Sequence, residues 1–263
     1  MSAQHRARKC FGQHFLVDPG VIGEIVSAIA ATDDDTLVEI GPGQGAITGP
    51  LVDTGAEFHA VEFDRDLVPR LREQFAGNER VEIHEADALQ FDFTSIGDDL
   101  RVVGNLPYNI STPLLFRLGT FREQIRDMHF MLQKEVVDRI TAEAGTKQYG
   151  RLTIMLGCQF EAMKLFDVPP DAFQPPPKVM SSIVALRPLP AERYDVADIE
   201  ALSALVAQAF SKRRKTLRNA LKGVASEEQL SAAGIDGALR PEQVPIDQWV
   251  SLSNQLHAAA QSG

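Results

Sequence analysis

Between residues 18 and 132, short apolar segments alternate with segments whose apolar residues recur at helical spacing. Asp18 and Pro19 predict the start of a first helix, because an N-cap carboxylate followed by proline is a common helix beginning. The predicted strands cover residues 36–40, 58–63, 80–84, 100–105 and 127–132. Strands that alternate with helices form a mostly parallel sheet with helices on both faces. The sequence therefore predicts an α/β fold.

The pattern changes after residue 160, where two strand-like segments, residues 161–168 and 181–188, are separated only by the loop "PPDAFQPPPKVM". This spacing predicts an antiparallel hairpin at an edge of the sheet. A proline-containing linker follows at residues 187–195, and the chain beyond it has a helical pattern. We therefore expect a domain of residues 1–189 with a basic N-terminal extension, residues 1–15, and a helical domain of residues 190–263.

The composition suits a folded protein, since 44% of the 263 residues are hydrophobic. No apolar stretch approaches the roughly 20 residues of a membrane span, and the N-terminus lacks the apolar region of a signal peptide. The two cysteines, Cys10 and Cys158, lie far apart, with no CxxC or histidine cluster near them, so they suggest neither a disulfide framework nor a zinc site. A cytoplasmic protein with no membrane partner and no metal is expected.

The segment "VEIGPGQGAITGPL" places glycines at 41, 43 and 45 after a buried strand. Glycine lets a ligand lie against such a turn, whose backbone amides are free, although a plain tight turn would have the same composition. The spacing is GxGxG and not the GxGxxG of dinucleotide-binding folds, which argues strongly against a nicotinamide oxidoreductase. Glu62 and Asp87 end the next two strands, where carboxylates can accept hydrogen bonds from ribose hydroxyls and an adenine amino group. The sequence predicts a nucleoside pocket at this edge of the sheet.

The fourth predicted strand ends in "GNLPY", so Asn105, Leu106 and Tyr108 should face that pocket. An exocyclic amine such as adenine N6 is a poor nucleophile because its lone pair is delocalised into the ring. The Asn105 side-chain oxygen and the Leu106 carbonyl could accept its two hydrogens and aim the lone pair at a methyl donor. Tyr108 offers a face on which a base can stack. The alternative is a β-turn with a packed tyrosine.

A family resemblance rests on several segments, in this order and spacing: "FGQHFL", "EIGPGQG", "VEFDRDL", "ADAL", "GNLPYNISTPLLF", "MLQKEVVDRI", "YGRL", "PPPKVMSSIV" and "FSKRRKTLRNAL". Over nearly its whole length the chain resembles the bacterial small-subunit ribosomal RNA adenine dimethyltransferases. The resemblance implies a Rossmann-like class I methyltransferase fold that uses S-adenosylmethionine. It also implies transfer of four methyl groups to two adjacent adenosines in the terminal hairpin of that RNA, in a late, immature small subunit.

The resemblance also implies roles for individual residues. The residues implied for the cofactor site are His14, Leu16, Gly41, Glu62, Asp87 and Asn105. Asn105, Leu106 and Tyr108 would form the catalytic corner, and Phe173 would stack with Tyr108 on the flipped adenine. A buried loop phenylalanine is the alternative for Phe173. At Cys10 the sequence departs from the family, in which a basic residue is more usual, and this puts one phosphate contact in doubt.

The segment 210–222 carries six basic residues and no acid, although the whole chain has a net charge of −10. On a helical wheel Val206, Phe210, Leu217 and Leu221 share one face, and basic residues share the other. A solvated face normally mixes charges, so an uncompensated basic face favours an anionic partner such as the RNA backbone. The predicted RNA-binding residues are Arg6, Arg8, Lys9, Lys212, Arg213, Arg214, Lys215, Arg218 and Lys222.

Two other functions remain open on the sequence. The protein could be a non-catalytic assembly factor of the small ribosomal subunit, although the intact "NLPY" allows catalysis. It could also be a large-subunit adenine methyltransferase of the macrolide-resistance type, which shares the catalytic corner, but "FSKRRKTLRNAL" favours the small-subunit family. A monomer is expected.

Overall fold

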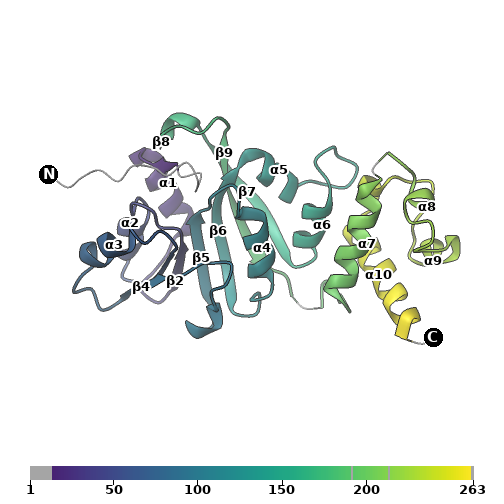
Figure 1. The fold of residues 1–263 in the computed structure, drawn as a ribbon, viewed down its shortest axis with the longest axis horizontal. Helices are drawn as coiled ribbons and strands as arrows, with labels where there is room; N and C mark the ends of the chain where they lie inside the picture. The colour runs from purple at the N-terminus through teal and green to yellow at the C-terminus, as the bar shows by residue number, and fades with distance from the viewer. Residues whose placement is uncertain (1–13, 191, 213, 262–263) are drawn as a thin grey trace. The chain divides into compact units, whose positions relative to one another are not determined.

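The computed structural model describes residues 14–190, 192–212 and 214–261, and Figure 1 shows its fold. The chain divides into two compact units. The first comprises the described residues up to Val137 together with Met163–Pro188, and the second comprises Asp138–Ala162 together with the described residues from Leu189 onward. The break at Pro188 lies next to the boundary expected near residue 190. Residues 138–162, which precede that boundary, belong to the second unit.

The main sheet has seven strands in the order β4-β3-β2-β5-β6-β9-β7, all of them in the first unit except the beginning of β7, residues 160–162. Pairing is parallel from β4 to β6 and antiparallel between β6 and β9. The strands are β2 (Thr36–Ile40), β3 (Glu57–Glu62), β4 (Val81–Glu85), β5 (Leu100–Asn105), β6 (Ile125–Gln133), β7 (Phe160–Val168) and β9 (Ser181–Pro188). The predicted fold class is confirmed, including the two later strands at one end of the sheet.

Helices and a small second sheet complete the first unit. The helices are α1 (Pro19–Ile29), α2 (Thr48–Val52), α3 (Val68–Gln74), the 3-10 turn η2 (Phe93–Ser95), α4 (Ser111–Gly119) and η3 (Pro170–Ala172). Asp18 caps α1 as predicted, since its carboxylate accepts from the amides of Gly20 and Val21 at 2.8 and 3.0 Å. The small sheet pairs β1 (Phe15–Leu16) with β8 (Phe173–Gln174), which ties the start of the described chain to the loop before β9.

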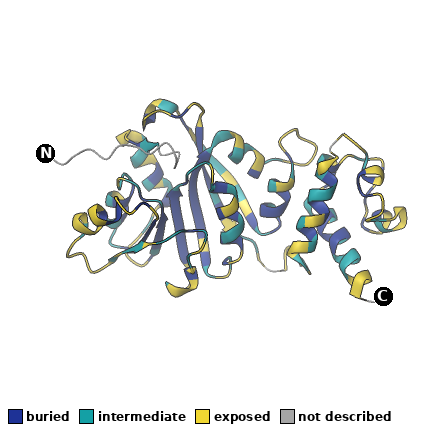
Figure 2. Cartoon of the chain, in the orientation of Figure 1, coloured by how far each residue is buried: buried dark blue, intermediate teal, exposed yellow. Residues whose placement is uncertain are grey.

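The core of the first unit lies against the central strands, which are mostly dark blue in Figure 2. Leu37, Phe58 and Val103 are fully buried and belong to one hydrophobic cluster with Ile25 and Ile29 of α1. These apolar side chains alternate along their strands with residues of the opposite face, as the pleat requires. Burial on this scale contributes about 1.5–3 kcal/mol for each large side chain.

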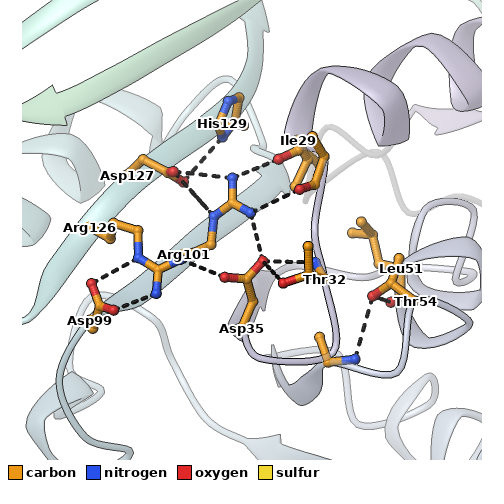
Figure 3. A network of polar contacts seen from close by, with 12 residues as sticks. Ile29, Thr32, Asp35, Leu51, Thr54, Asp99, Arg101, Arg126, Asp127 and His129 are labelled. Atoms are coloured by element: carbon orange, nitrogen blue, oxygen red, sulfur yellow. Dashed lines mark hydrogen bonds and ion pairs between the residues drawn. The ribbon is translucent and has the colours of Figure 1, made fainter.

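A polar network that is buried around Arg101, Asp35 and Asp127 holds the strand beginnings at the amino edge of the same sheet (Figure 3). Arg101 donates from β5 to Asp127 of β6 at 3.1 Å and to Asp35, just before β2, at 2.9 Å. It also donates to the carbonyl of Ile29 at the end of α1, at 2.6 Å. Arg126 pairs with Asp35 and with Asp99. These bonds fix the register of three neighbouring strands, and therefore the positions of their opposite, carboxyl ends.

The second unit is helical in its described part. Its elements are α5 (Lys134–Ile140), which begins in the first unit, α6 (Arg151–Gly157), α7 (Ile199–Ser211), α8 (Leu217–Ala220), α9 (Glu227–Ala232), η4 (Pro241–Gln243) and α10 (Ile246–Gln261). Trp249 of α10 is fully buried with Leu202 and Val206 of α7. Tyr149 donates its hydroxyl proton to the carbonyl of Val244 at 2.8 Å, which joins the segment before α6 to the C-terminal helices.

The prediction of one continuous basic helix over residues 210–222 was wrong. Helix α7 ends at Ser211 with Lys212 as its C-cap, and the four-residue α8 begins only after Thr216. Two loop carbonyls, of Leu239 and Gly237, accept from the first amides of α8 at 2.7 and 3.0 Å. Tertiary hydrogen bonds thus end one helix and start another, and like charges at helical spacing would oppose a continuous helix. We call the exposed residues Lys212, Arg214 and Lys215, between α7 and α8, the basic turn; Arg213 lies outside the described residues.

Candidate active site

The chain turns sharply where β2 ends, through three glycines with positive φ angles: 67° at Gly41, 59° at Gly43 and 83° at Gly45. This left-handed region strains any residue with a side chain. The space around a Cβ at Gly41 is open, so a side chain there would project into the space beside the turn. The Gly41 amide donates to the carbonyl of Val61 at 2.9 Å, which holds the turn against β3. We call this turn, formed by Gly41, Gly43 and Gly45, the glycine wall; it is open on the side of Gly41.

Glu62 ends β3 beside this wall and is 6% exposed. Its two oxygens accept from the amides of Gly43 at 3.1 Å and Asp64 at 2.8 Å. Burial raises the pKa of Glu62, while these amide hydrogen bonds oppose the rise. The amide of Phe63 also donates to this carboxylate, whose two oxygens together still have acceptor capacity for a further donor, such as a ribose hydroxyl.

Asp87 follows β4 and is half-buried. One carboxylate oxygen accepts from the amide of Leu89 at 2.9 Å, and the other accepts from the Gln90 side chain at 3.2 Å. The carboxylate is therefore oriented by its own loop. Because β2, β3 and β4 are parallel, Asp87, Glu62 and the glycine wall lie along one edge of the sheet.

The segment "GNLPY" forms the next part of this edge, at the end of β5. Gly104 is required by packing, because a Cβ there would collide with the Ile40 carbonyl oxygen of β2. Asn105 donates from its side-chain amide to the carbonyl of His14 at 3.2 Å, and the Leu106 amide donates to the carbonyl of Met131 at 3.3 Å. The Leu106 side chain is buried, which anchors the corner.

Tyr108 is held on two sides. Its hydroxyl is 2.9 Å from the Ser181 hydroxyl, and its ring centroid is 5.9 Å from that of His14 with an interplanar angle of 29°. Burial raises the pKa of Tyr108, and the bond to Ser181 opposes the rise. His14 Nδ1 lies 2.7 Å from the carbonyl of Pro175, so the N-terminal strand is tied to the same corner.

These elements enclose one cavity of about 390 Å³. Eight residues singled out in the sequence line it: His14, Leu16, Gly41, Glu62, Asp87, Asn105, Leu106 and Tyr108. Its donors and acceptors fit S-adenosylmethionine. The open glycine wall leaves room for the amino acid part, buried Glu62 suits the ribose hydroxyls, and the carboxylates suit a cationic ligand.

The chain matches the model of a protein family described as ribosomal RNA adenine dimethylase over residues 4–258. It is 54% identical to "Ribosomal RNA small subunit methyltransferase A" of Aromatoleum aromaticum, over 97% of this chain and 96% of that protein. A protein of the same name from Methylococcus capsulatus is 53% identical, over 97% of this chain and 99% of the relative. The chain belongs to the ribosomal RNA adenine dimethylase family. The family inferred from the sequence is confirmed, and with it the assignment as an enzyme that methylates adenine in ribosomal RNA.

Solved structures agree with this membership. A dimethyladenosine transferase from Plasmodium falciparum is similar with a TM-score of 0.82 and 25% identity, over 94% of this chain and 98% of that one. The 23S rRNA methyltransferase ErmE is similar with a TM-score of 0.72 and 26% identity, over 92% and 99%. The cavity of this dimethylase therefore lies in a methyltransferase fold of the expected class.

Phe173 is placed differently from the other predicted residues. It is 4% exposed, belongs to the hydrophobic cluster beneath α1 and is not among the residues that line the cavity. Its backbone pairs with Leu16 through the β1–β8 bridge, which holds the ring inward. The structure does not bring Phe173 and Tyr108 together as two walls of a base-binding slot.

Among the other residues that line the cavity, Glu39 and Phe63 are two that the sequence analysis missed. Glu39 of β2 is buried and accepts a hydrogen bond from the Thr48 hydroxyl at 2.5 Å, and burial raises the pKa of Glu39 to about 8. Phe63, which follows Glu62, is 60% exposed at the cavity. An acid within the apolar strand before the glycines was the available signal for Glu39, and adjacency to Glu62 was the signal for Phe63.

The predicted RNA-binding residues fall into three groups. Arg6, Arg8 and Lys9 lie outside the described residues, as does Arg213. Lys212, Arg214, Lys215 and Lys222 are exposed, and none of them pairs with an acid in the described part of the chain. Arg218 does, because its guanidinium binds both carboxylate oxygens of Glu227, at 2.6 and 2.5 Å. The expectation that no nearby acid compensates this segment was wrong for Arg218.

In the described ranges, no helix combines the length and the apolar character that a membrane span requires.

Proposed function

We propose that this dimethylase transfers methyl groups from S-adenosylmethionine to N6 of two adjacent adenosines in the 3′-terminal hairpin of small-subunit ribosomal RNA. The observation that carries the proposal is the shared cavity, in which the glycine wall and Glu62 lie together with the "GNLPY" corner. Relatives more than 50% identical over nearly their whole length bear the name of a small-subunit methyltransferase. The substrate that these names indicate, small-subunit ribosomal RNA, therefore agrees with a cavity suited to methylation of an adenine amine.

Each lining residue has a role in the proposal. Glu62 accepts from the ribose hydroxyls, Asp87 accepts from the adenine amino group of the cofactor, and Gly41 lets its amino acid part approach the backbone. His14, Leu16 and Asn105 close the pocket from the N-terminal strand and from β5. When bound, the cofactor supplies an electrophilic methyl group on a positively charged sulfur.

The substrate amine is oriented by the corner after β5. In the unmethylated amine, the Asn105 side-chain oxygen and the Leu106 carbonyl accept the two N6 hydrogens, which favours a tetrahedral nitrogen and directs its lone pair at the methyl group. Each transfer forms a bond from N6 to the methyl carbon as the bond from that carbon to sulfur breaks, and one N6 hydrogen leaves as a proton to water. Tyr108 stacks on the flipped base, with about 1–3 kcal/mol from stacking. Phe173 would join it only after leaving its buried position. As proposed, the reaction needs no metal, because the oriented amine is the nucleophile and the positively charged sulfur is already a good leaving group.

RNA docking is assigned to the exposed cations. We place phosphate contacts at Lys212, Arg213, Arg214, Lys215 and Lys222, and at Arg6, Arg8 and Lys9 of the N-terminal extension. Arg218 contributes less, because Glu227 already neutralises it. The proposed substrate is the immature small subunit, met in the cytoplasm by a monomeric enzyme.

The alternatives are less well supported. A purely structural assembly factor would not require a cavity in which acids, glycines and the "GNLPY" corner lie together. The 23S rRNA methyltransferase ErmE is 26% identical to this chain, about half the identity of the small-subunit relatives.

Incubation with labelled S-adenosylmethionine and unmethylated small subunits, followed by nucleoside analysis, tests the proposal. The expected product is N6,N6-dimethyladenosine at two adjacent positions of the small-subunit RNA. Label found only in large-subunit RNA would favour the resistance-type activity. Binding to the subunit without any label in nucleosides would instead make the protein an assembly factor.

A further inference from the structure

Two histidines and two glutamates gather on one face of the β3–β4 pair. The strands are parallel, with His59 opposite Glu82 and Val61 opposite His84, so His59, Glu82 and His84 share a face. His59 Nδ1 lies 3.1 Å from His84 Nε2, and the ring centroids are 5.3 Å apart. Glu82 brings one oxygen to 3.6 Å from His59 Nδ1. One ligand atom from each of the three residues lies within 4.8 Å of the others.

The state of the His59 ring gives a second, independent observation. Its side chain is 8% exposed, and its Nε2 is buried without a hydrogen-bond partner in the described residues. The Glu57 carboxylate stands 3.4 Å from that nitrogen. If Nδ1 gives its lone pair to a cation, Nε2 must carry the proton, and Glu57 becomes its acceptor. A carboxylate behind a ligating histidine is the usual support of a protein metal site.

The donor set selects a class of metal. Imidazole nitrogens with one carboxylate suit Zn²⁺ and its neighbours in the first transition row, whereas Mg²⁺ and Ca²⁺ prefer oxygen ligands alone. Two nitrogens bound to a tetrahedral zinc are about 3.3 Å apart by the usual bond lengths, close to the separation of His59 and His84. The Glu82 side chain is 65% exposed, which leaves a path for the ion and a position for water.

We propose that His59, His84 and Glu82 bind a divalent transition metal of the zinc class, with Glu57 orienting His59. None of these residues lines the cofactor cavity, so the site is separate from methyl transfer. The metal joins β3 to β4, the strands that lead to Glu62 and Asp87. Its role is therefore structural: it holds together the two strands that present the carboxylates of the cavity.

Titration with Co²⁺ followed by visible absorption tests the site, because tetrahedral Co²⁺ has intense visible bands and Zn²⁺ displaces it. One equivalent should bind, without the near-ultraviolet thiolate band that a cysteine ligand would give. Glu57→Gln should weaken binding by about 10–100-fold. Glu82→Gln and His84→Gln, which remove ligands, should weaken it at least as much.

Matched controls are available on the same chain. Glu85→Gln changes an exposed acid three positions along β4, on the opposite face, and His257→Gln changes a histidine of α10; both should leave Co²⁺ binding unchanged. If His59→Gln fails to fold because His59 is buried, the more exposed variants His84→Gln and Glu82→Gln still show whether these residues bind the metal. Zn²⁺ should raise the melting temperature of the wild type and not of His84→Gln.

Two results would overturn the proposal. Absence of Co²⁺ and Zn²⁺ binding would leave the histidines as a pair that shares a proton. Binding that survives His84→Gln and Glu82→Gln would place the metal elsewhere. Neither result bears on methylation, which is measured separately with the small subunit.

Discussion

The cavity at the carboxyl edge of the sheet and the basic turn of the second unit are built in opposite ways. The cavity is made from strand ends, glycines with left-handed backbone and two acids, Glu62 and Asp87, whose carboxylates are held by hydrogen bonds from loop residues. The described residues of the basic turn, Lys212, Arg214 and Lys215, are exposed and lie between the end of α7 and the start of α8. A desolvated site can orient reacting groups, whereas exposed cations attract phosphate with little orientation. We therefore expect changes in the cavity to alter chemistry or cofactor affinity, and changes in the turn to alter only salt-dependent docking.

The largest effect is expected at Asn105. Asn105→Ala removes an interaction with the substrate amine that strengthens in the transition state, so turnover should fall on the order of 10²–10³-fold. RNA affinity should hardly change, because Asn105 is far from any basic cluster in sequence and carries no charge. Single-turnover methylation with saturating small subunits measures this. A nearly normal rate would remove Asn105 from the catalytic corner.

The next largest effect separates cofactor binding from RNA binding. Glu62→Ala removes a buried carboxylate that we assign to the ribose hydroxyls, and S-adenosylmethionine affinity should drop by roughly 1.5–3 kcal/mol. Isothermal titration calorimetry reports this directly, with binding of the small subunit as the control that stays constant. Unchanged cofactor affinity would show that the ribose is held elsewhere.

A packing change at the same edge should lower stability. Gly104→Ala forces a Cβ against the Ile40 carbonyl oxygen, and overpacking of this kind destabilises by about 1–3 kcal/mol. Gly23→Ala is the matched control, because Gly23 lies in α1 with open space around its Cβ. Urea unfolding should show the loss for Gly104→Ala and no loss for Gly23→Ala. Equal stability of the two variants would contradict the close approach of β5 to β2.

Glu39 provides a pH test of burial in the cavity. The folded-state pKa of about 8 is above the unfolded value of 4.5, so the folded state binds the proton more tightly. This stability is fully present below the unfolded pKa and is lost as the pH rises through the folded pKa. Between about pH 6 and about pH 7, the wild type should lose up to about 1.4 kcal/mol relative to Glu39→Gln. Urea titrations without cofactor check this, and parallel pH curves would indicate a solvated carboxylate.

Substitutions in the basic turn should change the stability of the fold least and the binding of RNA most clearly. Replacing Lys212 and Lys215 with Gln should flatten the slope of log affinity against log salt by about 1.5–2 units and leave the melting temperature almost unchanged. Glu227→Gln, which releases Arg218 from its ion pair, should have the opposite sign and strengthen RNA binding. An unchanged slope in both variants would mean that the RNA docks on another surface.

The sequence predicted the strand edge well because each signal there is local. A left-handed turn needs its glycines, and residues that follow parallel strands meet at one edge whatever the details of packing. Segments whose structure depends on distant partners were not predictable in this way. The break after Ser211 depends on the carbonyls of Gly237 and Leu239, and the inward position of Phe173 depends on pairing with Leu16. His59 and His84 lie 25 positions apart in the sequence and come together only through the register of β3 and β4. No spacing in the sequence therefore predicted their contact.

The central claim is that the strand edge carries out the chemistry and that the basic turn only docks the RNA. Its most direct test is turnover at saturating concentrations of small subunits, measured for Asn105→Ala and for the double variant Lys212→Gln/Lys215→Gln. We expect wild-type turnover for the lysine variant, once higher substrate concentration overcomes its weaker binding. For Asn105→Ala we expect a loss of turnover on the order of 10²–10³-fold under the same conditions. A lysine variant that remains slow at saturation, or an Asn105→Ala enzyme that dimethylates at the wild-type rate, would contradict this division of roles.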